Sequence, residues 1–196
     1  MKKLVAGGAA IILLAVGCNN NKKPGDITIK GKDGETVTIN TNDYAEKAKQ
    51  LKASMEELQK LKPYTLDEMK KLMPSEIMGT AQSDYEAVSF SGVSQASAKY
   101  KLNDSAKVKL SIIDCAGTAG YGMYNMRMLM NFEQDNDREY TKSTEFNGGK
   151  AVENCKKKRN DCSFTFFSGN RFMVVLDGDN AGIEKLKEIA GGLNIK

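Results

Sequence analysis

The feature of this chain that most constrains its fold is a succession of short alternating segments between Ser83 and Asp177. Within each segment apolar and polar residues alternate, which is typical of a half-buried β-strand. Asn147-Gly148 and Gly169-Asn170 each separate two such segments and are typical of tight hairpin turns. We expect strands over residues 85–90, 94–102, 107–114, 140–146, 150–155, 162–167 and 171–177. Strands joined by turns this short predict an antiparallel sheet.

Helices are expected where this alternation stops. Thr65-x-x-Glu68 has the form of a capping box, and it precedes a short helix over 66–73 that Pro74 ends. Residues 124–132 and 183–190 have helical apolar spacing. The order predicts an α+β domain over 75–196. We expect an antiparallel β-sheet of about six to seven strands, in two meander-plus-helix halves, with the helices packed on one face.

Two further elements are expected before this domain. Ile27 and Ile29, then Val37 and Ile39, alternate with polar residues on either side of a Gly-rich turn, which predicts a β-hairpin within residues 26–41. Residues 42–74 form a helical segment whose amphipathic first helix ends at Pro63. That helix could bind a partner, but packing on its own domain is favoured because it has few heptads.

The N-terminal stretch predicts where the protein is located. Lys2 and Lys3 precede an apolar run over 4–16, the layout of an export signal, and the run is too short to span a bilayer. Its end, Ala15-Val16-Gly17-Cys18, resembles the lipobox of bacterial lipoproteins. The resemblance implies a signal peptide over 1–17, an acylated Cys18 and a lipidated tether over 18–25. Because Asn19 is not Asp, we expect the periplasmic face of the outer membrane.

Charge and cysteine content narrow the function classes. The formal net charge is +4, and removal of Lys2 and Lys3 with the signal lowers it to +2, which gives no reason to expect a nucleic-acid partner.

Export permits disulfides. Cys155 and Cys162 flank a polar turn-like segment, so an antiparallel hairpin would bring their Cα atoms to about 4.5–5.5 Å. We predict a Cys155–Cys162 disulfide and a reduced, buried Cys115.

The absence of histidine removes Ser-His-Asp and Cys-His catalysis and histidine metal ligands. Without a histidine base, Cys115 is better explained as a small buried residue than as a nucleophile. The loop glycines do not have the G-x-G-x-x-G spacing of a dinucleotide loop, so a plain turn is favoured over phosphate binding. The glycines in question are Gly117, Gly120 and Gly122.

Three other patterns have both a functional and a structural explanation. Soft thioethers suit Cu(I), and four methionines crowd the expected helix and the residue before it: Met123, Met126, Met128 and Met130. Three of them, Met123, Met126 and Met130, fall on one helical face beside Leu129, which is typical of a core face. Asp177, Asp179 and Glu188 nearly fit the spacing of a calcium loop. Ala181, however, supplies no oxygen ligand at a position that needs one. Asp179 or Asn180 is better explained as the N-cap of the last helix. The basic run 156–159 could contact anionic lipid or polyanion, and a solvated loop is the default. No cofactor or metal is assigned.

Several short motifs occur in order between Met73 and Lys187. They are Met73-Pro74 followed by Gly79, Ala98-x-Tyr100, Ile112-Ile113-Asp114-x-Ala116-Gly117, Tyr140-x-Lys142, Gly149-x-x-Val152-Glu153, and Asn170-Arg171-Phe172 leading to Leu186-Lys187. With these motifs, the chain from about Leu72 onward resembles a family of bacterial exported proteins of unknown function. The resemblance implies an α+β domain and carries over no catalytic residue. Cys155 and Cys162 are not part of that family's pattern.

These observations favour a membrane-anchored, non-enzymatic module that binds an envelope protein or supports the envelope. The alternative is a carrier of a small ligand or copper. An enzyme that uses Asp, Glu, Lys or Cys stays open, because such sites assemble in space. Two structural features would discriminate these classes. A pocket lined by facing carboxylates would favour an enzyme, and an exposed apolar patch near the first helix would favour a protein partner.

Overall fold

The computed structural model describes residues 26–30, 36–40, 52–53, 56–120 and 133–195. The chain divides into two compact units, one that ends at Lys52 and one that begins at Ala53. The predictions for the signal peptide, Cys18, the tether, most of the first helix and the 124–132 helix lie outside the described residues.

The first unit contains a two-stranded antiparallel hairpin. Strand β1 (Asp26–Lys30) pairs with β2 (Thr36–Asn40), and the register places Ile27 opposite Ile39 and Ile29 opposite Val37. The predicted hairpin is therefore confirmed. The register thus sets the alternating apolar residues of the two strands directly opposite one another.

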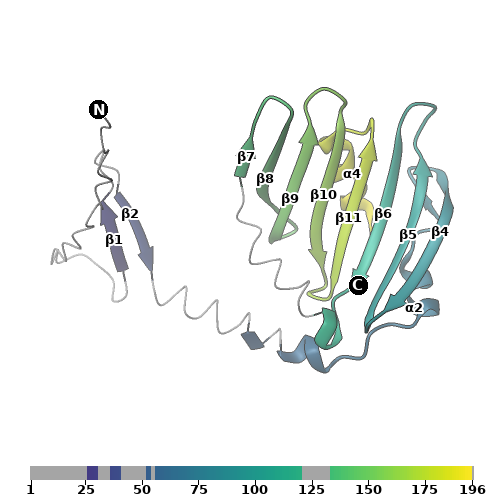
Figure 1. Ribbon diagram of the computed structural model, residues 1–196, viewed down its shortest axis with the longest axis horizontal. Coiled ribbons are helices and arrows are strands. Elements are labelled where there is room, and N and C mark those ends of the chain that lie inside the picture. Colours follow the sequence, from purple (N-terminus) through teal and green to yellow (C-terminus); the bar gives the residue numbers. More distant parts are fainter. Residues whose placement is uncertain (1–25, 31–35, 41–51, 54–55, 121–132, 196) are drawn as a thin grey trace, which may run out of the picture. The chain divides into compact units, whose positions relative to one another are not determined.

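The second unit is built on one nine-stranded antiparallel sheet (Figure 1). The strand order is β3-β4-β5-β6-β11-β10-β9-β8-β7, so β6 and β11 join two meanders at the centre. The bounds are β3 Glu76–Ile77, β4 Thr80–Phe90, β5 Val93–Lys101, β6 Lys107–Asp114, β7 Glu133–Asp135, β8 Glu139–Phe146, β9 Gly149–Lys156, β10 Asp161–Ser168 and β11 Phe172–Asp179. The α+β class is confirmed at this level.

The sheet is larger than the predicted six to seven strands, because each edge carries one short extra strand. β3 turns into β4 through Met78 and Gly79, whose φ angles of 52° and 75° are those of a tight hairpin turn. β7 directly follows the predicted 124–132 helix, at residues where we predicted no strand, and a turn capped by Asn136 leads from it into β8. Strands of two and three residues are too short for alternation to reveal.

Two described helices pack on the sheet. Helix α2 (Leu66–Leu72) begins at the predicted capping box, in which Thr65 and Glu68 bond to each other's backbone amides. Helix α4 (Ile183–Gly192) has Gly182 as its N-cap, so the prediction of Asp179 or Asn180 was wrong. The reason is that β11 stays extended through Asp179, and the helix begins only after the chain has turned.

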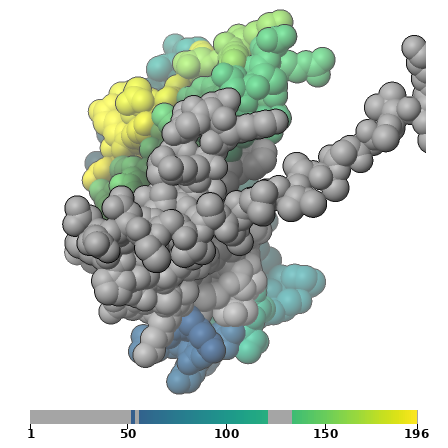
Figure 2. Space-filling view, turned by 90° about the vertical axis from the view of Figure 1, so that its left-hand side faces the viewer, coloured from purple at the N-terminus to yellow at the C-terminus, as the bar shows by residue number. Residues whose placement is uncertain are grey.

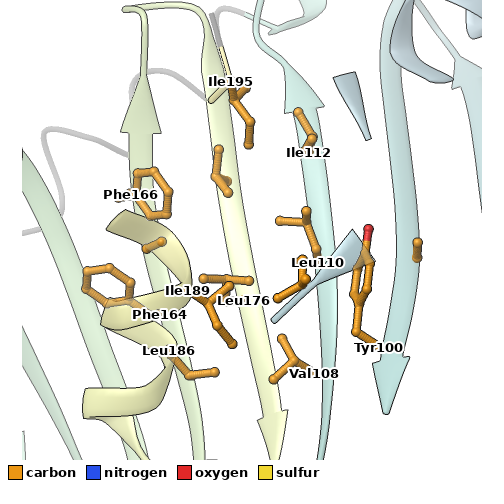
Figure 3. Packing of buried hydrophobic residues seen from close by; sticks show 14 of the residues in the cluster. Tyr100, Val108, Leu110, Ile112, Phe164, Phe166, Leu176, Leu186, Ile189 and Ile195 are labelled. Atoms are coloured by element: carbon orange, nitrogen blue, oxygen red, sulfur yellow. The ribbon is translucent and has the colours of Figure 1, made fainter. Parts of the chain in front are cut away.

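Both helices bury their apolar sides against the same face of the sheet, and Figure 3 shows this packing for Leu186 and Ile189 of α4. Met69 of α2 and Leu186 and Ile189 of α4 belong to one apolar cluster with the centre of the sheet. The strand residues of that cluster include Tyr100, Val108, Leu110, Ile112, Phe164, Phe166, Val174 and Leu176. In Figure 2, which views the sheet from its β7–β8 edge, the C-terminal residues (yellow) gather on one side of the green strands. One face thus holds the core described here.

The opposite face carries a continuous polar row. Directly opposed residues of antiparallel strands share a face, and one row crosses eight strands without an apolar member. Its members are Ser83, Lys99, Lys109, Asp177, Ser163, Asn154, Thr141 and Gln134. Asp177 therefore belongs to a sheet surface and not to a loop that could wrap a calcium ion.

The predicted cysteine pair is confirmed. Cys155 lies directly opposite Cys162 on β9 and β10, their Cα atoms are 4.1 Å apart and their sulfur atoms 2.12 Å apart. Both cysteines belong to the apolar cluster on the helix side of the sheet. Nearby, the Nζ of Lys187 on α4 lies 2.8 Å from a carboxylate oxygen of buried Glu153 on β9. The two contacts stabilise the part of the sheet on which α4 packs.

Candidate partner-docking surface

A buried ion pair forms at the end of the two central strands. Asp114, the last residue of β6, is fully buried, and Arg171 directly precedes β11. Arg171 donates from Nε to Oδ1 of Asp114 at 2.9 Å and from Nη2 to Oδ2 at 2.8 Å. This is the bidentate geometry that planar guanidinium and carboxylate groups favour. Hydrogen bonding to Asp114 is also the main reason that the pKa of Arg171 is raised.

The same pair binds the segment that leads into α2. The backbone N–H of Tyr64 donates to Oδ2 of Asp114 at 2.7 Å, and Nη2 of Arg171 donates to the carbonyl of Lys62 at 2.9 Å. The guanidinium also lies 4.0 Å from the centre of the Tyr64 ring, a cation–π distance. Residues 62–64 are therefore held to the end of the sheet. We call the Asp114–Arg171 pair and its bonds to residues 62–64 the clamp.

Ser94 of β5 forms a second contact that holds the segment before α2 to the sheet. Its hydroxyl donates to the carbonyl of Tyr64 at 2.6 Å and lies 3.3 Å from the hydroxyl of Ser89 on β4. A Cβ added to Gly117 would lie 3.2 Å from the Pro63 ring. The segment before α2, the β4–β5 turn and the residues after β6 thus meet at one end of the domain, at the bottom of Figure 1.

Four large apolar side chains are exposed around this end. Leu61 and Leu66, on either side of the clamped residues, are each 44% exposed, while Val88 and Phe90 at the end of β4 are 46% and 77% exposed. We call these four residues the apolar end surface. Leu66 begins α2 on the helix side of the sheet, whereas Val88 and Phe90 point to the other face, so the four residues lie around one end of the sheet and not on one face. Isolated exposed apolar residues are ordinary, but several near one end of a domain are typical of a site that another molecule covers.

The rigid attachment of this surface distinguishes it from a mobile loop. Asp114 accepts four hydrogen bonds: two from Arg171, one from Tyr64 and one from the backbone N–H of Ala116. A buried carboxylate satisfied in this way fixes the backbone that surrounds it. Leu61 and Leu66 are consequently presented in a defined position relative to β4, which lowers the entropic cost of binding.

Cys115 follows Asp114 and is a structural residue. It is fully buried and free, and burial raises the pKa of its thiol to about 11. The thiolate, which is the nucleophilic form, is therefore scarce near neutral pH. This agrees with the prediction that Cys115 is a buried, reduced residue.

The glycines after Cys115 also have a structural explanation. A Cβ at Gly120 would lie 2.3 Å from the carbonyl carbon of Cys115, so the backbone passes too close for any side chain. Gly117 has φ +77°, the left-handed region that favours glycine. Gly122 lies outside the described residues. The tight turn, and not a phosphate, accounts for the two glycines that the structure describes.

The residues considered for a calcium loop do not converge. Asp177 and Asp179 lie on β11, and Asp179 is 3.7 Å from Nζ of Lys107. Glu188 lies on α4 and is bound to Lys185 at 2.6 Å. Among the residues that the structure describes, no three acidic, cysteine or histidine side chains are grouped so that they could hold a metal ion. The methionine helix considered for copper lies outside them.

The basic run is partly paired. Lys157 forms an ion pair with Asp135 of β7, and Arg159 lies 3.1 Å from Asp161. All four basic side chains are exposed at the β9–β10 turn. The run thus has the solvated environment that was expected by default, and two of its charges have acidic neighbours.

A groove on the helix side of the sheet offers space for a small ligand. It has a volume of about 440 Å³ and lies between the α2–β3 segment and α4. Its apolar lining includes Met73, Ile77, Ile189 and Leu193, and the exposed carboxylates Glu76 and Glu188 lie at its rim. Exposed carboxylates lack the burial that tunes a catalytic acid or base.

No protein-family model, curated protein or solved structure matches this chain. Within the described residues, no helix is long and apolar enough to cross a membrane.

Sequence reasoning found part of this surface and missed the rest. Asp114 and Arg171 were quoted only within motifs of the family resemblance, and Tyr64, Leu61 and Leu66 were not singled out. The sequence pattern that could have predicted the ion pair is an acidic residue, Asp114, at the end of one predicted strand and an arginine, Arg171, at the start of another. Such a pair is expected to meet, because adjacent antiparallel strands bring opposite ends together.

Proposed function

We propose that this protein is a lipid-anchored, non-enzymatic module of the bacterial envelope that docks a protein partner on its apolar end surface. The single observation that carries the proposal is the set of exposed side chains Leu61, Leu66, Val88 and Phe90 around the buried clamp. Exposed apolar and aromatic side chains on a rigidly held backbone are typical of protein interfaces.

The lipid anchor at Cys18 is the second part of the proposal. The export signal and the Ala15-Val16-Gly17-Cys18 motif support it, and Asn19 in place of Asp favours the periplasmic face of the outer membrane. Two or more acyl chains hold a protein firmly to a bilayer. An anchored domain meets its partner within the same membrane layer, where confinement raises the effective concentration.

Photo-crosslinking in the native envelope tests the docking surface. A photoreactive amino acid is placed at Leu66 or at Phe90, with exposed Lys109 on the polar sheet face as the matched control. We expect specific protein adducts from both apolar positions, identified by mass spectrometry, and few from the control. Equal adduct yields from all three positions, or none from the apolar positions, would contradict the proposed surface.

The alternative function is a carrier of a small ligand or copper. The groove between α2–β3 and α4 is the observation that favours the small ligand. An apolar fluorescent probe that bound there, and that Ile189→Lys displaced while Phe90→Lys did not, would favour the carrier over the docking module.

A further inference from the structure

The outer side of β4 is open along most of its length in the part of the chain that the structure describes. There β3 pairs only with Thr80 and Ala81, and the carbonyl of Ser75 accepts the N–H of Gln82. A bulge follows, at which the register shifts between Ser83 and Glu86 and Asp84 takes φ 50°. Bulges and inward charges protect sheet edges, so residues 86–90 are the regular, unprotected part of this edge.

The turn after β4 fixes which backbone groups face outward. Ser91 and Gly92, with φ of 51° and 82°, form a two-residue turn, and Phe90 pairs with Val93. Residues that flank such a turn exchange both backbone hydrogen bonds, and bonded and non-bonded pairs then alternate along the strand. Val88 therefore bonds to β5, while Ala87 and Ser89 direct their N–H and C=O groups toward the open side.

We propose that a second copy of this chain adds its own β4 to this edge, antiparallel, with Val88 opposite Val88 of the second copy. This inference rests on the proposed function, since it names the partner that covers part of the apolar end surface. In this register Ala87 and Ser89 exchange reciprocal backbone hydrogen bonds with Ser89 and Ala87 of the second copy. Glu86 lies opposite Phe90 of the second copy, so no like charges are directly opposed.

The side chains of this edge support the same register. Val88 lies opposite Gln95, which lies opposite Ile113, so Val88 points to the sheet face away from α2 and α4. Phe90, two residues on, points to the same face. Both are exposed in the single chain, and cross-strand apolar pairs would cover them in the dimer. The contact is self-complementary and closes on itself, as an isologous dimer requires.

The other edge of the sheet does not offer an equivalent surface. β7 has three residues, Glu133–Asp135, all exposed and two of them acidic. Very short, charged edge strands are a common protection against pairing. A head-to-tail contact of β4 with β7 of another copy would also leave a free edge at each end and produce an open chain of molecules. The β4–β4 contact avoids both problems.

Disulfide trapping tests the register in the full chain. In the proposed pairing Val88 and Val88 of the second copy form a non-hydrogen-bonded pair with a Cα separation of about 4.5 Å. The Cys155–Cys162 bond of this sheet, with Cα atoms 4.1 Å apart, shows that directly opposed residues can be bridged. Val88→Cys should form a disulfide-linked dimer under mild oxidation at least about tenfold faster than Glu86→Cys, because association holds only the former thiols together. Cys115 is buried and does not interfere.

Sedimentation velocity gives an independent readout of the same proposal. The unmodified chain should sediment as a dimer, and Val88→Lys should convert it to a monomer by placing two charges opposite each other. Met78→Lys, which changes an equally exposed apolar residue outside residues 86–90, should remain a dimer. A monomeric unmodified chain, or Val88→Cys bridging no faster than Glu86→Cys, would overturn the inference.

The two proposals fail in different ways. If the chain is monomeric while Leu66 and Phe90 still crosslink to another protein, the inference is wrong and the proposed docking function stands. If the chain is monomeric and neither position gives protein adducts, both are wrong.

Discussion

Arg171 holds Asp114 through two parallel hydrogen bonds at the point where β6 ends and β11 begins. Phe172, the residue after Arg171, pairs directly with Asp114. The ion pair between Arg171 and Asp114 therefore lies where the two meanders of the sheet join. The ion pair also binds the backbone of Tyr64, and through it positions the segment that carries Leu61 and Leu66. One side-chain contact thus connects the centre of the sheet with the candidate docking surface.

Loss of the Asp114 charge should strongly destabilise the domain. Asp114→Asn keeps the shape of the side chain but leaves Arg171 without its counter-charge, and breaking a buried pair costs about 3–5 kcal/mol. Urea unfolding followed by circular dichroism measures the change. Lys99→Ala, which breaks the exposed pair with Asp84, is the matched control and should cost less than about 1 kcal/mol. Equal losses from the two variants would show that Asp114 has no special role.

Arg171→Lys should loosen the segment before α2 more than it lowers global stability. Lysine keeps the positive charge but loses the bidentate geometry and the stacking on the Tyr64 ring. Hydrogen–deuterium exchange should therefore accelerate at the Tyr64 amide, which donates to Asp114, while the amides of β10 stay protected. Unchanged exchange at Tyr64 would mean that Asp114 alone holds the segment.

The cysteine bridge between β9 and β10 should contribute measurably to stability. It closes a loop of about 8 residues, for which the chain-entropy relation gives about 2.5 kcal/mol as an upper value. The double variant Cys155→Ala/Cys162→Ala should lower the urea midpoint, and reducing agent should have no further effect on it. Digestion without reduction should yield the linked 155–162 peptides. Three thiols free to alkylate, or Cys115 found in the bridge, would contradict the assignment.

The lipid anchor makes a prediction that does not depend on the fold. Cys18→Ser removes the only thiol in the lipobox-like motif, so the protein should leave the membrane fraction and appear in the soluble envelope fraction. Asn19→Ser, next to it, leaves the thiol in place and should stay in the membrane. A Cys18→Ser protein that remains membrane-bound would refute acylation at this position.

The alternation of short segments was enough to predict seven of the nine strands of the large sheet, and Asn147-Gly148 and Gly169-Asn170 marked two of the turns between them. It was also enough to place Cys155 opposite Cys162, because that pairing depends only on a local hairpin. β3 and β7 escaped prediction, since two or three residues show no period. The clamp could not be predicted for a different reason. Tyr64 and Asp114 are 50 residues apart in the sequence, and no local pattern indicates that they form a contact.

Burial of Cys115 and Tyr100 should make the domain less stable at alkaline pH. Burial raises the pKa of the Cys115 thiol from 9.0 to about 11 and that of the Tyr100 hydroxyl from 10.0 to about 12. As pH rises above the unfolded values, the unfolded chain releases protons that the folded chain retains, so the free energy of unfolding falls. The decrease begins near pH 9 for Cys115, extends to about pH 11, and has a limiting slope of about 1.4 kcal/mol per pH unit for each group. Urea midpoints measured from about pH 8 to about pH 10.5 should therefore fall, and Cys115→Ala should make that fall shallower. An identical slope in Cys115→Ala would mean that the thiol ionises as readily in the folded protein as in the unfolded chain.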